Sequence, residues 1–221
     1  MFVIRVSGGL CNRLRTVCSY CKYVYDLNTS LLVIWTPDIS CPGFFCDYFK
    51  PIDNVTFIRS NKNNIPVNYY GCSGKKEYQP DYKELQLLPH MIQILKNNIH
   101  ALQNNYIAVH VRRTDHIVLA KKNNCYTSDK EFLEFIQEHN TIYNVYIATD
   151  NKTTYDTFRH HLQEKIILPY HKEMNSLRNT TLKDSIIDLY MCVYATTFKG
   201  SGWSSFSSAI QVIRYYIEPL I

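Results

Sequence analysis

Two adjacent arginines, Arg112 and Arg113, directly follow the most regular apolar stretch of the chain and could hold a phosphate group. Both side chains are always cationic, and each carries a planar fork of N–H donors that matches phosphate oxygens. Asp115 follows closely and could hold one fork in place. Alone, these residues would suit a surface ion pair equally well, and such pairs contribute little to stability. The surrounding elements have to decide between the two interpretations.

The segment before the arginines, Tyr106–Val111, has the pattern of a buried β-strand. Its residues are β-favouring or small, and His110 lies near its end. Open α/β sheets bind ligands outside the carboxyl ends of their strands. The arginine pair therefore lies where a ligand would bind if further strands join this one in a parallel sheet.

The remainder of the C-terminal half supplies such strands, because strands and helices alternate as in a Rossmann-like domain. Residues 112–127 are expected to form a loop, and Ser128 with Glu131 forms a capping box that begins a helix. The elements expected after it are a strand at 143–148, a helix capped by Thr153 with Asp156, a strand at 165–168, a helix capped by Thr181 with Asp184 and a last helix at 209–217.

Two more strand ends carry polar groups. Asp150 follows the strand at 143–148 and could bind a ligand or only cap the next helix. The serine-rich turn at Gly200–Ser208 leads into the last helix, and its amides and hydroxyls could hold a diphosphate. A capped helix start with solvated serines would have the same sequence. All three strand ends fall on one edge of the predicted sheet, and this convergence favours a binding site.

The N-terminal half opens as a second Rossmann-like unit, with a glycine turn between its first strand and helix. Gly8–Gly9 lets the backbone approach a ligand, and Asn12 and Arg13 add donors at the helix start. A plain tight turn explains the glycines equally well. The expected elements are strands at 2–6, 31–35 and 55–58, helices ending at Asp26 and opening at Pro89, and a polar, aperiodic segment at 60–83 that is a candidate lid.

Composition sets further bounds. The 221 residues, 46% hydrophobic and 19% charged, suit one large or two small globular domains. A net charge of +5 is too small to indicate nucleic acid, so no nucleic-acid partner is expected, and it fits a small anionic ligand. Neither a signal peptide nor a membrane-spanning window is recognisable, which predicts a cytoplasmic protein without an integral membrane segment. Cys18 and Cys21 have metal-pair spacing but fall in an apolar helical repeat, so buried thiols are expected.

The segment His110-Val-Arg-Arg-Thr-Asp115 resembles the arginine motif of the α1,6-, α1,2- and protein O-fucosyltransferases. Supporting similarities occur in the same order as in that group. They are Gly8-Gly-Leu-Cys-Asn-Arg13 with the N-terminal glycine turn, Tyr146-Ile-Ala-Thr-Asp150 with the strand after the motif, Arg178 through Asp188 with the arginine-to-helix segment, and Ser204-Ser205 with the final serine motif.

The resemblance implies an α/β fold of two Rossmann-like domains, the GT-B type, with GDP-fucose as donor. The domains would be an acceptor-side domain at 1–87, a linker helix at 88–104 and a nucleotide-sugar-binding domain at 105–221. Arg112 would be the essential residue that grips the β-phosphate. The donor-binding residues implied beside it are Gly9, Asn12, Arg13, His110, Arg113, Asp115, Asp150, Ser204, Ser205 and Phe206. Of these, Arg113 and Asp115 would shape the loop, Asp150 would lie toward the guanine or its shell, and Ser204 and Ser205 would lie toward the phosphates. Phe206 stands where the α1,6 enzymes have glutamine.

Sugar transfer from a nucleoside diphosphate needs help for the leaving diphosphate, from a metal ion or from fixed cations. The chain has arginines at a strand end and no Asp-X-Asp metal motif. We therefore expect a metal-independent, inverting fucosyltransferase without cofactors, acting on a glycan or protein hydroxyl. Conceivable general bases are His116, Asp115, Asp47 and His90, and none has a sequence signature.

Three alternatives stay open from the sequence. A GT-B glycosyltransferase could use another donor, such as another GDP-sugar or a rhamnosyl, xylosyl or mannosyl donor. A non-catalytic nucleotide- or glycan-binding module could keep the fold, although the intact arginines argue against it. Nucleic-acid binding ranks last.

Overall fold

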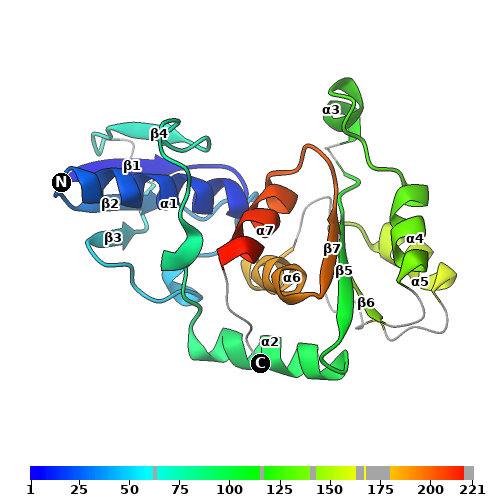
Figure 1. Cartoon of the computed structure of the whole chain (residues 1–221). Helices are drawn as coiled ribbons and strands as arrows, with labels where there is room; N and C mark the ends of the chain where they lie inside the picture. Colours follow the sequence, from blue (N-terminus) through cyan, green and yellow to red (C-terminus); the bar gives the residue numbers. More distant parts are fainter. Residues whose placement is uncertain (62–63, 115–116, 140–142, 163–166, 168–179, 217–221) are drawn as a thin grey trace. The chain divides into compact units, whose positions relative to one another are not determined.

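The computed structural model describes residues 1–61, 64–114, 117–139, 143–162, 167 and 180–216 (Figure 1). The chain forms two compact units. The first, unit 1, comprises Met1–Met91 with Thr181–Lys183. The second, unit 2, comprises Ile92–Thr180 with Asp184–Ile221. Each unit contains one parallel sheet.

Unit 1 contains a sheet with the strand order β3-β2-β1-β4. Helix α1 connects β1 to β2, so the predicted strand–glycine turn–helix–strand opening is confirmed. The bounds are β1 Phe2–Val6, α1 Leu10–Asp26, β2 Leu31–Trp35, β3 Val55–Ile58 and β4 Tyr69–Gly71, with short 3-10 turns η1 at Phe45–Asp47 and η2 at Tyr82–Glu84.

The sequence prediction missed β4. Tyr69–Gly71 pairs in parallel with Ile4–Val6, inside the segment where no strand was expected. Three residues are too few to display an alternating pattern, and the strand forms because the edge of β1 offers unpaired backbone groups.

Unit 2 has the strand order β6-β5-β7, with all strands parallel. The central strand β5 is buried along its whole length. The bounds are α2 Pro89–Ala101, β5 Tyr106–Val111, α3 Ile117–Lys122, α4 Asp129–Glu138, β6 Asn144–Thr149, α5 Lys152–His161, α6 Leu182–Tyr194, β7 Thr197–Gly200 and α7 Ser205–Tyr216. Helix α2 starts in unit 1, and the first two residues of α6, Leu182 and Lys183, also belong to unit 1.

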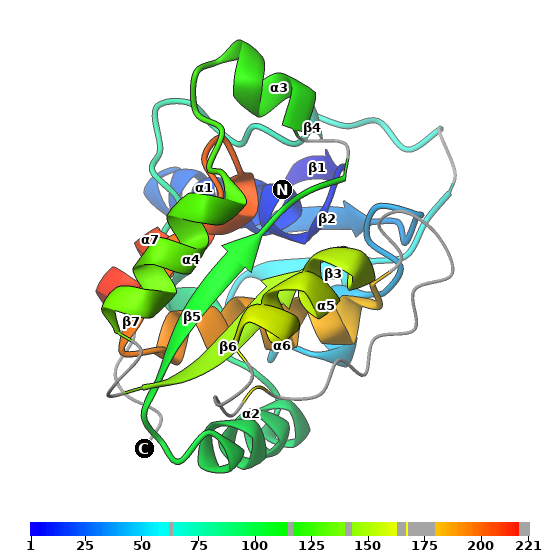
Figure 2. The same cartoon turned by 90° about the vertical axis from the view of Figure 1, so that its right-hand side faces the viewer.

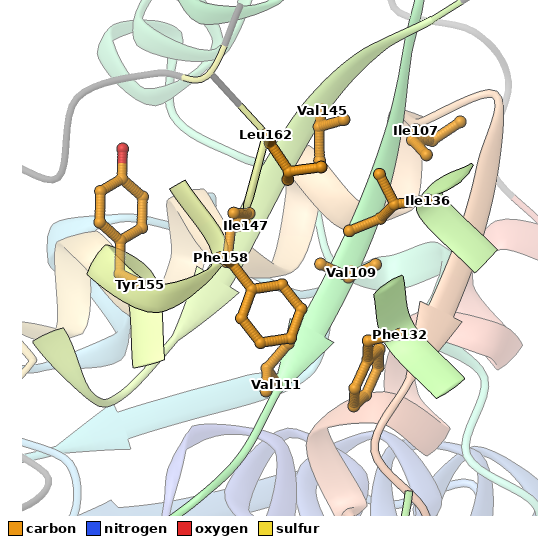
Figure 3. Close-up of a cluster of buried hydrophobic side chains, with 10 residues drawn as sticks. All are labelled: Ile107, Val109, Val111, Phe132, Ile136, Val145, Ile147, Tyr155, Phe158 and Leu162. Carbon is orange, nitrogen blue, oxygen red and sulfur yellow. The ribbon is translucent and has the colours of Figure 1, made fainter. Parts of the chain in front are cut away.

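Helices cover both faces of the unit 2 sheet (Figures 1 and 2). Because successive side chains of a strand point to opposite faces, β5 serves both layers. One face packs against α4 and α5 in an apolar cluster (Figure 3); its members are Ile107, Val109, Val111, Phe132, Ile136, Val145, Ile147, Tyr155, Phe158 and Leu162. On the other face, the Tyr106 hydroxyl donates to the carbonyl of Met191 on α6 at 2.7 Å. His110 lies on this second face.

The helix starts include one confirmed prediction and two that are wrong, the cap of α5 and the start of the last helix. The last helix begins at Ser205 rather than at Ala209, because the serines before Ala209 form its first turn. The capping box of α4 is confirmed, since Ser128 and Glu131 bond reciprocally. The predicted cap of α5 is wrong: Asn151 accepts from the Thr154 amide, and the helix starts at Lys152. The expected loop at 112–127 contains the short helix α3. The predicted strand at 165–168 falls almost wholly outside the described residues.

The Cys18–Cys21 pair is not part of a metal cluster within the part of the chain that the structure describes. Burial raises the pKa of the Cys18 thiol well above its usual value and that of Cys21 to about 12. Without a bound metal ion, both thiols are therefore protonated at neutral pH. Among the described residues, no helix has the length and apolarity that a bilayer crossing requires.

Candidate functional site: the carboxyl edge of the unit 2 sheet

The predicted convergence of three strand ends occurs in the structure. Val111 is level with Thr149 of β6, and His110 is level with Gly200 of β7. Arg112, Asp150 and the serine-rich turn consequently follow neighbouring strand ends at one edge of a parallel sheet. A ligand at this edge would meet all three.

Ser201 ties the arginine segment to the serine-rich turn. Its amide and its hydroxyl both donate to the carbonyl of His110 at 3.0 Å. The hydroxyl in turn accepts the backbone N–H of Arg112 at 2.9 Å. Two connections that are remote in sequence therefore form one hydrogen-bonded unit, and the backbone of Arg112 is fixed relative to the start of α7.

His110 is a buried anchor for α7. Its Nδ1 lies 2.8 Å from the Ser207 hydroxyl oxygen, and its ring stacks on Phe206 with centroids 4.7 Å apart. Only 6% of the residue is exposed. A direct contact of His110 with a donor stays a prediction, and the observed contacts add a positioning role. The stacking gives Phe206 a structural role, and its contact with a donor stays a prediction.

The N-terminus of α7 offers backbone amides at this edge. Ser204 is buried and caps the helix, its hydroxyl accepting from the Ser207 amide at 3.5 Å. Ser205 is the first residue of α7 and is half-buried. Unpaired N–H groups and the positive end of the helix dipole favour an anion at this point. Gly200 lets the first turn of α7 pack close to the end of β7, because a Cβ at Gly200 would lie 2.6 Å from the Ser207 side chain.

The two arginines have different environments. The Arg113 side chain is 10% exposed, donates from Nε to Asp129 at 2.9 Å, and forms an ion pair with the same carboxylate through Nη2. Its guanidinium lies over the rings of Tyr126 and Phe132. Arg113 is thus held by α4 and the loop before it, and its role in shaping a donor-binding loop stays a prediction. Arg112 is half-buried at the sheet edge.

Asp150 organises the loop after β5. One carboxylate oxygen accepts from the Thr114 hydroxyl at 2.7 Å, and the other faces the Arg113 amide at 3.5 Å. These contacts make Asp150 a connector between β6 and the arginine segment; whether it also faces a guanine stays a prediction. Asp115 lies outside the described residues.

The predicted donor-binding residues of unit 1 surround the glycine turn before α1. Gly9 precedes α1 without a side-chain cap, and the Asn12 side chain accepts from Arg15 at 3.1 Å. Arg13 is fully buried and donates to the carbonyls of Gly8 and Thr36 at 2.7 and 2.6 Å and to Asp38 at 2.5 Å. Its guanidinium therefore holds the loop after β2, and any effect on a ligand would pass through the shape of the turn.

The structure does not bring the two described candidates for the general base, Asp47 and His90, into contact with each other. Asp47 pairs with Arg59 at 2.8 Å on the surface of unit 1. The His90 ring lies beside Tyr48 in unit 1, with centroids 6.5 Å apart. His116, like Asp115, is outside the described residues.

Sequence reasoning missed Ser201, Ser207, Thr114 and Asp129 as parts of this site. The first two belong to the serine-rich turn, but nothing in a run of serines indicates which of them bond to β5. Thr114 lies inside the arginine motif. Asp129 is in the first turn of α4, where an acidic residue is ordinary, so its ion pair with Arg113 is visible only in the structure.

Two parallel sheets with flanking helices define the class: the α/β fold matches the GT-B-like structures of NodZ and POFUT1. Solved structures with this fold include NodZ α1,6-fucosyltransferase soaked with GDP-fucose, with a TM-score of 0.63 and 14% identity over 96% of this chain and 92% of that chain. The fucosyltransferase NodZ from Bradyrhizobium matches with a TM-score of 0.65 and 13% identity over 96% of this chain and 92% of that chain. POFUT1 in complex with GDP-fucose matches with a TM-score of 0.67 and 13% identity over 96% of this chain and 94% of that chain.

The family model for GDP-fucose protein O-fucosyltransferase matches residues 12–217, and the chain belongs to this fucosyltransferase family. No curated protein matches the sequence.

Proposed function

We propose that the protein is a metal-independent, inverting fucosyltransferase that moves L-fucose from GDP-fucose to a glycan or protein hydroxyl. The observation that supports this most is the hydrogen-bonded unit at the edge of the unit 2 sheet, which fixes Arg112 beside the N-terminus of α7 within the family's motif. A diphosphate at this edge would meet a guanidinium and helix amides together.

In the proposed mechanism, Arg112 stabilises the diphosphate as it leaves. As the glycosidic bond breaks, negative charge grows on the β-phosphate, and a fixed cation placed there lowers the barrier. Asp129 holds the Arg113 guanidinium. Arg112 is assigned to the phosphate by its place in the arginine motif, directly after the central strand of the sheet. His110, Ser201 and Ser207 position it through the backbone rather than by touching the reacting atoms.

The runner-up is a GT-B glycosyltransferase with another nucleotide-sugar donor, because the described contacts do not include a sugar pocket. Incubating the purified chain with GDP-fucose, GDP-mannose and the UDP- and dTDP-sugars, with and without a chelator, tests the proposal by release of the nucleoside diphosphate. We expect release from GDP-fucose above the other donors and no loss with chelator. Preference for another donor, or dependence on added metal, would contradict it.

A further inference from the structure

Trp203 combines solvent exposure with an unfavourable backbone conformation. Its side chain is 57% exposed, and its φ of 57° lies in the left-handed region. A bulky side chain is disfavoured in this region. Among the residues that the structure describes, the other non-glycine residues with positive φ are asparagines and one glutamine. An exposed tryptophan at such a position costs stability and contributes no core packing, which points to a use in binding.

The turn around Trp203 is fixed on both sides. Ser201 bonds to His110 and Arg112, as described above, and Ser204 caps α7. Between them, the Gly202 amide donates to the Thr127 hydroxyl at 3.1 Å, and a Cβ at Gly202 would lie 1.9 Å from the carbonyl oxygen of Cys125. The backbone therefore presents the indole ring outward from a rigid support.

The position of Trp203 relative to Arg112 indicates which part of a donor it would meet. The strand order β6-β5-β7 places Arg112 after the middle strand, Asp150 after one outer strand and the turn with Trp203 after the other. A nucleotide sugar whose diphosphate rests at Arg112 has the nucleoside on one side and the sugar on the other. The nucleoside is assigned to the side of Asp150, the residue that the resemblance places toward the guanine or its shell, and Trp203 then lies on the sugar side.

We propose that Trp203 is the stacking platform for the sugar ring of the donor, with the indole face against the C–H face of the pyranose. This inference rests on the proposed function, since it takes Arg112 as the diphosphate site. Burying roughly 40 Å² of apolar ring surface corresponds to about a fivefold gain in affinity. The gain would apply to GDP-fucose and not to GDP.

The test is calorimetric titration of GDP and GDP-fucose into the full chain and its variants. Trp203→Asn removes the ring and installs a residue type that this chain already uses at positive φ, whereas Trp203→Phe keeps a ring. Tyr215→Asn on α7, 84% exposed, is the matched control. We expect Trp203→Asn to weaken GDP-fucose about fivefold with GDP unchanged. Trp203→Phe should stay near the wild type.

A second readout needs no variant. The chain has two tryptophans, and Trp35 is fully buried, so acrylamide should quench mainly Trp203. GDP-fucose should protect against this quenching, and GDP should not.

Equal weakening or equal protection with both ligands would assign Trp203 to the nucleoside. No effect of the variants on affinity and no effect of the ligands on quenching would exclude any binding role for Trp203. Both outcomes overturn the inference while leaving the proposed function intact. Failure of the wild type to bind either ligand would instead overturn the proposed function itself.

Discussion

Ser207 and His110 are 97 positions apart in the chain, yet the Ser207 hydroxyl oxygen lies 2.8 Å from Nδ1 of the buried His110 ring. This bond joins the first turn of α7 to the end of β5, directly before the arginine pair. The carboxyl edge of the unit 2 sheet thus depends on a contact between two side chains that are remote in sequence.

Replacing Ser207 by Ala should destabilise the protein by about 1–3 kcal/mol, because a buried ring nitrogen loses its partner. Urea denaturation measures the change. Ser208→Ala is the matched control, since Ser208 is exposed and its hydroxyl donates to the Ser204 carbonyl within the same helix turn at 3.1 Å. Equal effects of the two variants would argue against a specific role for the His110 bond.

Two glycines of the serine-rich turn should respond differently to alanine. A Cβ at Gly202 meets the Cys125 backbone, whereas a Cβ at Gly200 meets the Ser207 side chain at 2.6 Å. Both variants should lose about 1–3 kcal/mol through overpacking. A second substitution, Ser207→Gly, should partly rescue Gly200→Ala but not Gly202→Ala. A double-mutant cycle on unfolding free energies measures this coupling, and rescue of both variants would be inconsistent with the assigned contacts.

Asp129→Ala should lower turnover about tenfold or more, because the buried Arg113 guanidinium loses its partner and the loop that carries Arg112 loosens. Arg113 also donates to the Arg112 carbonyl at 3.2 Å, so the two arginines move together. Lys130→Ala changes only an exposed pair with Glu134 and serves as the control. Steady-state turnover with GDP-fucose measures the effect. Unchanged turnover in Asp129→Ala would exclude a coupling between the Arg113–Asp129 ion pair and Arg112.

The capping box of α4 predicts a pH effect on stability. Hydrogen bonds from the Ser128 amide and hydroxyl to the Glu131 carboxylate lower the pKa of that carboxyl group. Between the lowered folded pKa and the ordinary value of about 4.3, the unfolded chain binds more protons, so the contribution is present above that window and lost as pH falls through it. The effect is small because Glu131 is exposed.

Denaturation of the wild type and Glu131→Gln at pH 7 and at roughly pH 3.5 isolates this contribution. The wild type should lose more stability than the variant on acidification. Parallel losses in both proteins would show that the carboxylate form of Glu131 contributes nothing.

Much of unit 2 could be predicted because its signals are local. The apolar run of β5, the capping box at Ser128 and the strand ends at Arg112 and Asp150 are visible over a few residues. Parallel pairing then brings those ends together without further information, since all carboxyl ends share one edge.

The roles of individual side chains could not be predicted in the same way. Arg13 looks like a free donor at a helix start, but the carbonyls of Gly8 and Thr36 and the carboxylate of Asp38 engage it in the core of unit 1. The cap of α5 depends on which of two neighbouring polar residues folds back, and the short elements β4 and α3 carry too few residues for a period. These outcomes depend on tertiary contacts.

The central claim is that the Arg112 guanidinium stabilises charge on the departing β-phosphate, and single-turnover kinetics with GDP-fucose on Arg112→Lys tests it most directly. Lysine keeps the charge but loses the planar fork. The account predicts that turnover falls by about a hundredfold or more in Arg112→Lys, while GDP-fucose still binds and the unfolding free energy stays near that of the wild type. Wild-type turnover in Arg112→Lys would contradict the account.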